Sequence, residues 1–153
     1  MALAETLQST PWLLTACVFV LSLLVGSFLN VVIHRLPIML DRQWREHARD
    51  MLAEGSAAPS PAASEPYNLV VPRSACPHCG ARITALQNIP VVSWLALGGK
   101  CAACRAPISA RYPVVELATA VLSAVVAWHF GWHWQTLAAL VFTWILVALT
   151  VID

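Results

Sequence analysis

The chain has 153 residues, of which 59% are hydrophobic and 11% are charged. Soluble domains carry roughly 25% charged residues, so this composition excludes a disordered chain and disfavours a fully soluble globule. The formal net charge of +1 gives no reason to expect nucleic acid as a partner, and the chain is predicted to be an integral membrane protein.

The first apolar stretch runs from residue 12 to residue 33 and contains no charged side chain. At 1.5 Å per residue it makes about 33 Å of helix, which is enough to cross a hydrocarbon core. A cleaved signal peptide is the alternative, but residues 1–11 hold no Lys or Arg and the apolar run is too long. We therefore expect a transmembrane helix over 12–33, preceded by a tail of residues 1–11.

The segment from 34 to 112 contains all nine basic residues of the chain, so the positive-inside rule places it in the cytoplasm and residues 1–11 in the periplasm. Residues 40–52 mix charged and apolar side chains, which favours a short surface helix. Residues 53–66 are rich in Ala, Ser and Pro and are predicted to be a flexible linker. Residues 67–112 are predicted to form a small compact subdomain.

Two CxxC motifs in this subdomain are typical of a zinc site. Two residues between cysteines allow both sulfurs of a tight turn to reach one ion, so four thiolates can surround Zn²⁺ at about 2.3 Å. A cytoplasmic location disfavours stable disulfides, and a thioredoxin-type centre needs one CxxC rather than two. We therefore predict a structural zinc ion with no open coordination position and with four ligands, Cys76, Cys79, Cys101 and Cys104.

Two further apolar stretches, 113–128 and 136–153, lie near the C-terminus. Gly131 interrupts the helix between them, and the tryptophans around it suit the headgroup layer. We predict two transmembrane helices joined by a periplasmic turn at 129–135, with Asp153 at the cytoplasmic end of the last helix. The expected fold is an all-α polytopic membrane protein with three transmembrane helices and a small cytoplasmic tetracysteine zinc subdomain.

Each group of polar residues inside the predicted spans has either a structural or a functional interpretation. Ser22, Gly26 and Asn30 recur at every fourth position of the first span. We expect this small face to pack against another helix, and a substrate groove at Asn30 is the alternative. Glu116 lies about one turn into the second span, where a carboxylate is a functional-site candidate. Pairing with Arg111 or with a backbone donor is the preferred interpretation.

Four stretches of the chain carry a family resemblance. They read GSFLNVVIHRLP at 26–37, CPHC at 76–79, NIPVVSWLALGGKCAAC at 88–104 and PISARYPVVELATA at 107–120. In this order they resemble the N-terminal half of the type IV prepilin peptidases. Those proteins are the bifunctional leader peptidase/N-methyltransferases of type IV pilus and type II secretion systems.

The resemblance implies a multi-pass aspartic endopeptidase of the bacterial inner membrane. Such enzymes cut prepilins and pseudopilins after a glycine at the cytoplasmic membrane face, and they methylate the new N-terminus with S-adenosylmethionine. Their cytoplasmic tetracysteine domain binds zinc, in agreement with the four ligands predicted above. Membrane lipid is the other expected partner, and no residue is assigned to S-adenosylmethionine.

The resemblance also implies a catalytic role for Asp153, which ends a span reading LVALTVID as the family's first catalytic aspartate does. The family's second aspartate lies in a GxGD motif on a later span, which these residues do not include. Aspartic catalysis needs two carboxylates with separated pKa values. We therefore expect a truncated fragment that is inactive alone, and nothing in the family pattern supports Glu116 as a substitute.

Two other functions remain open from the sequence. One is a non-catalytic membrane-anchored zinc module that binds prepilins or assembly partners without processing them. The other is a membrane thiol oxidoreductase that uses one CxxC motif. Thiol titration separates them, because metal-bound cysteines react only after a chelator removes the metal.

Overall fold

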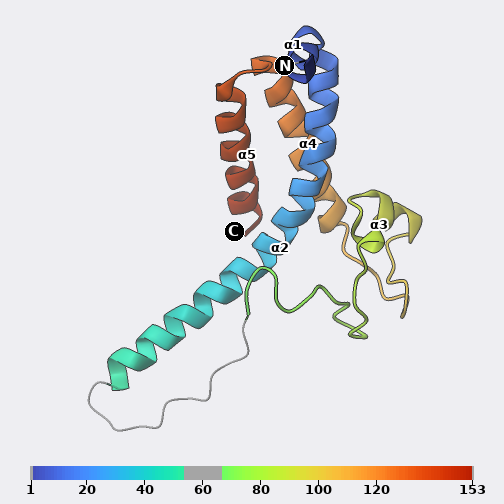
Figure 1. The fold of residues 1–153 in the computed structure, drawn as a ribbon. Helices are drawn as coiled ribbons and strands as arrows, with labels where there is room; N and C mark the ends of the chain where they lie inside the picture. Colours follow the sequence, from blue (N-terminus) through green and yellow to red (C-terminus); the bar gives the residue numbers. More distant parts are fainter. Residues whose placement is uncertain (1, 54–66, 153) are drawn as a thin grey trace.

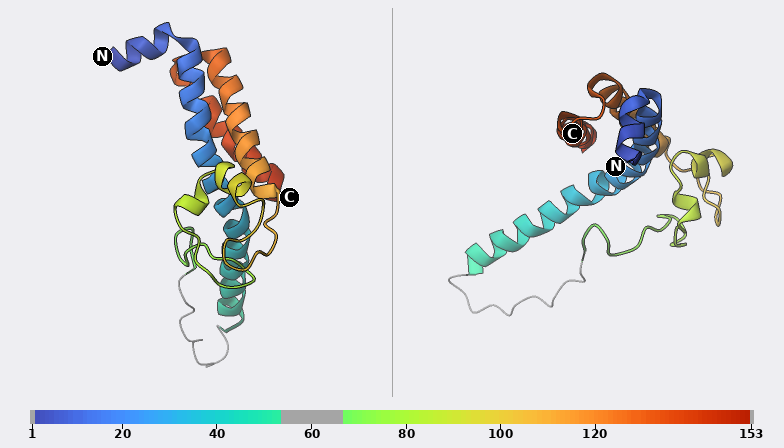
Figure 2. Two further views of the ribbon diagram at one scale, coloured as in Figure 1. Left: turned by 90° about the vertical axis from the view of Figure 1, so that its right-hand side faces the viewer. Right: turned by 45° about the horizontal axis from the view of Figure 1, so that its top comes forward.

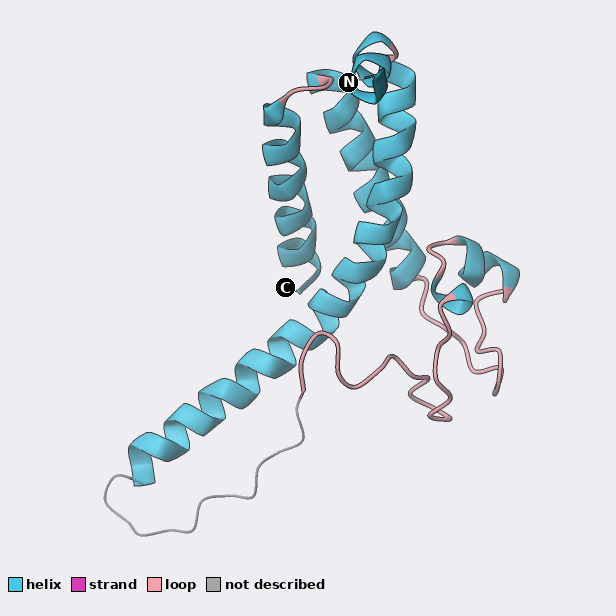
Figure 3. Cartoon of the chain, in the orientation of Figure 1, coloured by secondary structure: helices cyan, strands magenta, loops and turns pink. Residues whose placement is uncertain are grey.

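The computed structural model describes residues 2–53 and 67–152 (Figure 1). Within these ranges the chain is mostly helical, with loops over much of residues 67–110, and has no β-strand (Figure 3). The elements in chain order are α1 (Ala2–Ser9), α2 (Pro11–Ala53), the 3₁₀ turn η1 (Leu86–Asn88), α3 (Val92–Ala96), α4 (Arg111–Phe130) and α5 (Trp134–Ile152). The predicted linker lies outside the described residues apart from Ala53, which ends α2, and Asp153 lies outside them too.

Three helices are long and apolar enough to cross a membrane, namely α2, α4 and α5. This confirms the helical fold with three candidate spans. Helices α4 and α5 form a hairpin, and α2 runs beside α4 (Figures 1 and 2). Each helix of the hairpin is longer than expected, so the connecting turn contains only residues 131–133. The membrane sides assigned to these segments stay predictions.

Helix α2 does not end where the first span was expected to end. It continues to Ala53, so the predicted surface helix over 40–52 is the second half of one helix. Pro37 lies inside it and removes one backbone hydrogen bond, and Figure 1 shows a change of direction in this part of the helix. Beyond Pro37, good helix formers and the Asp41–Arg45 ion pair (2.9 Å, one turn apart) favour helix. Its 43 residues span about 64 Å, roughly twice a hydrocarbon core.

The interface between α2 and α4 is built from small residues. Ser22 of α2 is 1% exposed, and Thr119 and Ser123 of α4 are fully buried. At Gly26 the two backbones approach so closely that an added Cβ would lie 2.7 Å from the Cα of Glu116. The small face predicted on the first span is therefore a helix-packing face, because small side chains permit this close approach.

Helix α5 completes the bundle in two places. The indole Nε1 of Trp144 donates a 2.9 Å hydrogen bond to the hydroxyl of Ser123 on α4. Near the end of α5, Ala148 joins a buried apolar cluster with Leu29 and Ile33 of α2 and Val115 of α4. Ile152 packs against the same cluster, so the last described turn of α5 lies close to the middle of α2.

Candidate metal centre

The first CxxC motif forms a tight turn closed by two backbone hydrogen bonds. The N–H of Cys76 donates to the carbonyl of Ala81 at 2.9 Å, and the N–H of Gly80 donates back to the carbonyl of Cys76 at 2.9 Å. Gly80 has a φ of +69°, a left-handed conformation that glycine adopts without steric cost. The turn directs the two sulfurs to one side of the loop.

The second CxxC motif repeats this turn 25 residues later. The N–H of Cys101 donates to Ala106 at 2.8 Å, and the N–H of Arg105 donates to Cys101 at 3.0 Å. Arg105 takes the place of Gly80 and has a φ of +61°, a conformation that is strained for a residue with a Cβ. Strain of this kind persists only where the surrounding structure demands it, which here is the geometry of the second cysteine turn.

The two turns bring four sulfur atoms together. The Sγ atoms of the predicted ligands all lie within 4.8 Å of one another, and all four cysteines are free thiols. A tetrahedral shell with bonds of about 2.3 Å places its sulfurs about 3.8 Å apart. The sulfurs of Cys76 and Cys104 are 3.8 Å apart. The donor set therefore fits a metal ion of the size and ligand preference of Zn²⁺.

The pKa values of the clustered thiols also indicate that a bound cation would be favourable. Backbone N–H groups of Cys104 and Ala103 point at the Cys101 sulfur and lower its pKa to about 6. The N–H of Ala106 acts in the same direction on Cys104, but burial and the other three sulfurs outweigh it and raise that pKa to about 11. Four thiolates this close together repel one another, so full ionisation requires a positive charge between them.

A small apolar unit supports the second cysteine turn. The indole Nε1 of Trp94 in α3 donates to the carbonyl of Ile108 at 3.2 Å, and the N–H of Ile108 donates to Gly99 at 2.7 Å. Gly99 has a φ of +67°, and a Cβ there would lie 2.9 Å from the Trp94 ring. Helix α3 and the second turn are thereby held together as one unit.

Glu116 of α4 attaches this unit to the bundle. Its carboxylate Oε2 accepts a 2.7 Å hydrogen bond from the backbone N–H of Val91, the residue that precedes α3. Glu116 is 7% exposed, and Val91 has a φ of +58°. The sequence predicted a partner that was either Arg111 or a backbone donor, and the structure has the backbone donor.

Two polar residues of α2 make similar contacts with backbone carbonyls near the two ends of segment 67–112. Asn30 is 8% exposed and its Nδ2 donates to the carbonyl of Tyr112 at 3.1 Å. Arg35 is also 8% exposed, and its guanidinium donates to the carbonyls of Asn68 at 2.8 Å and Pro72 at 2.6 Å. These contacts fix both ends of segment 67–112 to α2 with charged or amide donors.

The importance of Arg35 was missed in the sequence, where it counted only as one of nine basic residues. The ring of Tyr67 lies beneath two guanidinium groups, 5.8 Å from that of Arg35 and 4.3 Å from that of Arg42. The available signal was an arginine two residues after an uncharged span and two residues before Pro37. A cation in that place is exposed to lipid unless protein backbone covers it.

The structure leaves the predicted catalytic residue untested, because Asp153 lies outside the described residues. The four predicted metal ligands come together, and Asn30 and Glu116 lie on facing helices near the docked segment. Both residues already bond to backbone groups, which gives them a structural role in holding the segment in place.

Comparison with known proteins gives one consistent result. The model of the bacterial peptidase A24 N-terminal domain matches residues 20–130. A prepilin leader peptidase/N-methyltransferase of Aeromonas hydrophila is 57% identical over 99% of this chain and 51% of its own length. Proteins of the same name from Pseudomonas aeruginosa and Neisseria gonorrhoeae are 54% and 51% identical, over 100% and 88% of this chain. The chain spans about half the length of these relatives, and no solved structure matches it.

Proposed function

The chain belongs to the bacterial peptidase A24 N-terminal domain family, and from this premise we propose that it is the N-terminal half of a prepilin leader peptidase/N-methyltransferase. The observation that carries the proposal is the match of nearly the whole chain to the first half of relatives with that name. The paired cysteine turns support it, because they form the tetracysteine cluster that the family resemblance implies.

The proposed reaction is hydrolysis of a prepilin after a glycine at the cytoplasmic face of the inner membrane. An aspartic peptidase needs one ionised carboxylate to activate water and one protonated carboxyl to polarise the scissile carbonyl. We assign Asp153 to one of these two roles and the second to an aspartate in the remainder of the longer protein. Asp153 directly follows Ile152, which packs against the cluster around Leu29 and Ile33 of α2.

The tetracysteine cluster is proposed to hold one structural zinc ion. Four thiolates fill a tetrahedral shell and leave no site for water or substrate, so the ion would supply folding energy and no chemistry. Its ligands lie on two turns that contain no regular strand and few buried apolar residues. Such a small unit gains little stability from a hydrophobic core, so metal binding would supply much of its folding free energy. Methyl transfer from S-adenosylmethionine is proposed for the whole enzyme, with no binding residue assigned in this half.

A fusion protein tests the peptidase assignment. The C-terminal half of the Aeromonas hydrophila relative is joined after residue 153, and cleavage of a prepilin is measured in membranes. We expect cleavage by the fusion and none by the 153-residue chain. Asp153→Asn in the fusion should reduce the rate by a factor on the order of 10⁴, as loss of one member of a catalytic set does. Asp50→Asn, at an exposed carboxylate on α2, is the matched control and should leave the rate unchanged.

Two results would contradict the proposal. Cleavage by the 153-residue chain alone would show that a second aspartate from the longer protein is not needed. An Asp153→Asn fusion that cleaves at the unaltered rate would remove the catalytic role of Asp153, although the family membership would remain.

A further inference from the structure

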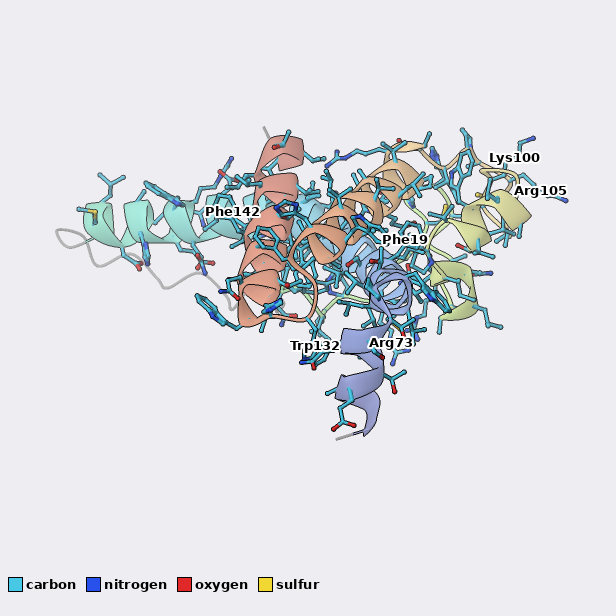
Figure 4. The ribbon with its side chains drawn as sticks, turned by 90° about the horizontal axis from the view of Figure 1, so that it is seen from above. Phe19, Arg73, Lys100, Arg105, Trp132 and Phe142 are labelled. Carbon is cyan, nitrogen blue, oxygen red and sulfur yellow. The ribbon has the colours of Figure 1, made fainter. Side chains whose placement is uncertain are left out.

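Segment 67–112 carries an unbalanced charge next to the membrane helices. It contains five basic residues and no Asp or Glu, whereas the second half of α2 has acidic and basic residues in equal number over 41–50. All five basic side chains are exposed, and none forms an ion pair with a described residue. They are Arg73, Arg82, Lys100, Arg105 and Arg111. Figure 4 shows Lys100 and Arg105 at the outer edge of the molecule, pointing away from the bundle.

The outer surface of α3 is apolar, whereas the outer face of a surface helix in a soluble domain is polar. Trp94 turns inward to the second cysteine turn, while Val92 and Leu95 are 60% and 65% exposed. In and after the preceding turn η1, Leu86 and Ile89 are also exposed. Four large apolar side chains within ten residues are therefore exposed, where a soluble module would bury them.

The depth of α3 along the bundle is fixed by its bond to α4. Val91 bonds Glu116, the fifth residue after Arg111, which is about 7.5 Å along the helix at 1.5 Å per residue. The interfacial layer on each side of a hydrocarbon core is about 5–8 Å thick. Because Arg111 begins α4, this offset places α3 within the thickness of one interfacial layer from the end of the helix, and Figure 1 shows α3 beside that end.

We propose that residues 86–96 rest in the headgroup layer of an anionic membrane, with Arg111, the basic residue that begins α4, against lipid phosphates. Interfacial elements combine apolar residues at the acyl boundary with Lys and Arg near anionic headgroups, and this segment has both. The Val91–Glu116 bond then has a further effect, because it holds α3 at the depth where its apolar side chains meet lipid. The cysteine turns lie below α3 and remain on the aqueous side (Figure 1).

Photo-crosslinking of the full chain in nanodiscs tests this orientation. Benzoylphenylalanine is placed at Leu95 or, as the matched control, at Ala103, an exposed residue between two cysteines of the second turn. Because only Leu95 lies in the proposed headgroup layer, we expect several-fold more lipid adducts at Leu95 than at Ala103. Replacing half of the phosphatidylcholine by phosphatidylglycerol should raise the Leu95 yield further.

Hydrogen exchange of the unmodified chain provides the second measurement. Amides of residues 86–96 should exchange more slowly in phosphatidylglycerol nanodiscs than in phosphatidylcholine nanodiscs, while those of 102–105 should not change. Equal lipid yields at Leu95 and Ala103 would overturn the proposal. Adducts at Leu95 between two copies of the chain, in place of lipid adducts, would overturn it as well, because they would show that protein covers residues 86–96.

Discussion

The backbones of Gly26 in α2 and Glu116 in α4 lie in close contact. A Cβ added to Gly26 would lie only 2.7 Å from the Cα of Glu116. The same Glu116 accepts the N–H of Val91 from the segment outside the bundle. One residue of α4 therefore sits at two contacts, one between membrane helices and one between the bundle and the cysteine module. The position of the module depends on how closely α2 and α4 pack.

Gly26→Ala should separate the two helices. The added methyl group meets backbone, which cannot move aside as a flexible side chain can, so we expect a loss of stability of about 1–3 kcal/mol. Thermal unfolding in detergent measures the change. Ala16→Leu, at an exposed position of the same helix, is the control and should have little effect. Equal stability of the two variants would contradict the close helix contact.

Glu116→Gln and Glu116→Ala should behave differently. Glutamine keeps a carbonyl oxygen that can accept from Val91, whereas alanine leaves this N–H without its partner, at a cost of about 1–3 kcal/mol. Hydrogen exchange at residues 91–96 reports the docking of α3 directly. Faster exchange is expected in the alanine variant only, and equally fast exchange in both would show that charge is required.

Arg35→Lys should release the start of the cysteine segment. Lysine cannot donate to the carbonyls of Asn68 and Pro72 in the same forked geometry, so one of these two part-buried hydrogen bonds is lost. We expect a cost of about 1–3 kcal/mol and faster proteolysis within residues 67–72. Arg45→Lys, in the exposed ion pair with Asp41, should cost less than about 1 kcal/mol. If proteolysis is the same in both variants, Arg35 does not hold the segment.

Purified chain should contain one zinc ion, and Cys101→Ser should remove it. Cys101 is the buried member of the cluster, so its loss opens the shell and leaves three ligands. Metal analysis and amide exchange of residues 76–106 measure the effect, which a chelator should reproduce in the unaltered chain. Cys17→Ser, outside the cluster, should retain the metal. Full zinc content in Cys101→Ser would exclude the four-thiolate site.

Acid should release the metal, because protons compete with it for the thiolates. Cys104, whose pKa is raised to about 11 without metal, takes up its proton first as the ion leaves. Cys101, with a pKa lowered to about 6, keeps its thiolate until the pH falls through that value. Zinc affinity measured by competition with an indicator should fall about tenfold or more per pH unit between about pH 8 and pH 5. An affinity independent of pH would contradict thiolate ligands.

Part of the structure followed from the sequence by local arguments. The three apolar helices depend on composition over windows of about 20 residues, and the small face of Ser22, Gly26 and Asn30 depends on the period of one helix. The cysteine turns depend on the two-residue spacing within each motif, which determines how the sulfurs point. Local patterns failed after residue 33, where the first span was expected to end, because α2 continues through Pro37 with a bend and ends at Ala53 (Figure 1).

What the sequence determined by itself was the kind of each element, that is, helices able to span a membrane and a donor set suited to a metal ion. Only the tertiary structure decided which polar side chains hold the module against the bundle, since Asn30 and Tyr112 are separated by 82 positions and Arg35 and Asn68 by 33. Hydrophobic periodicity says which face of a helix is buried but does not specify its distant partner. A buried polar side chain without a hydrogen bond costs more free energy than local helix preferences supply, so each such side chain must be paired in the folded protein. The partner is distant in sequence, so only the tertiary structure identifies it.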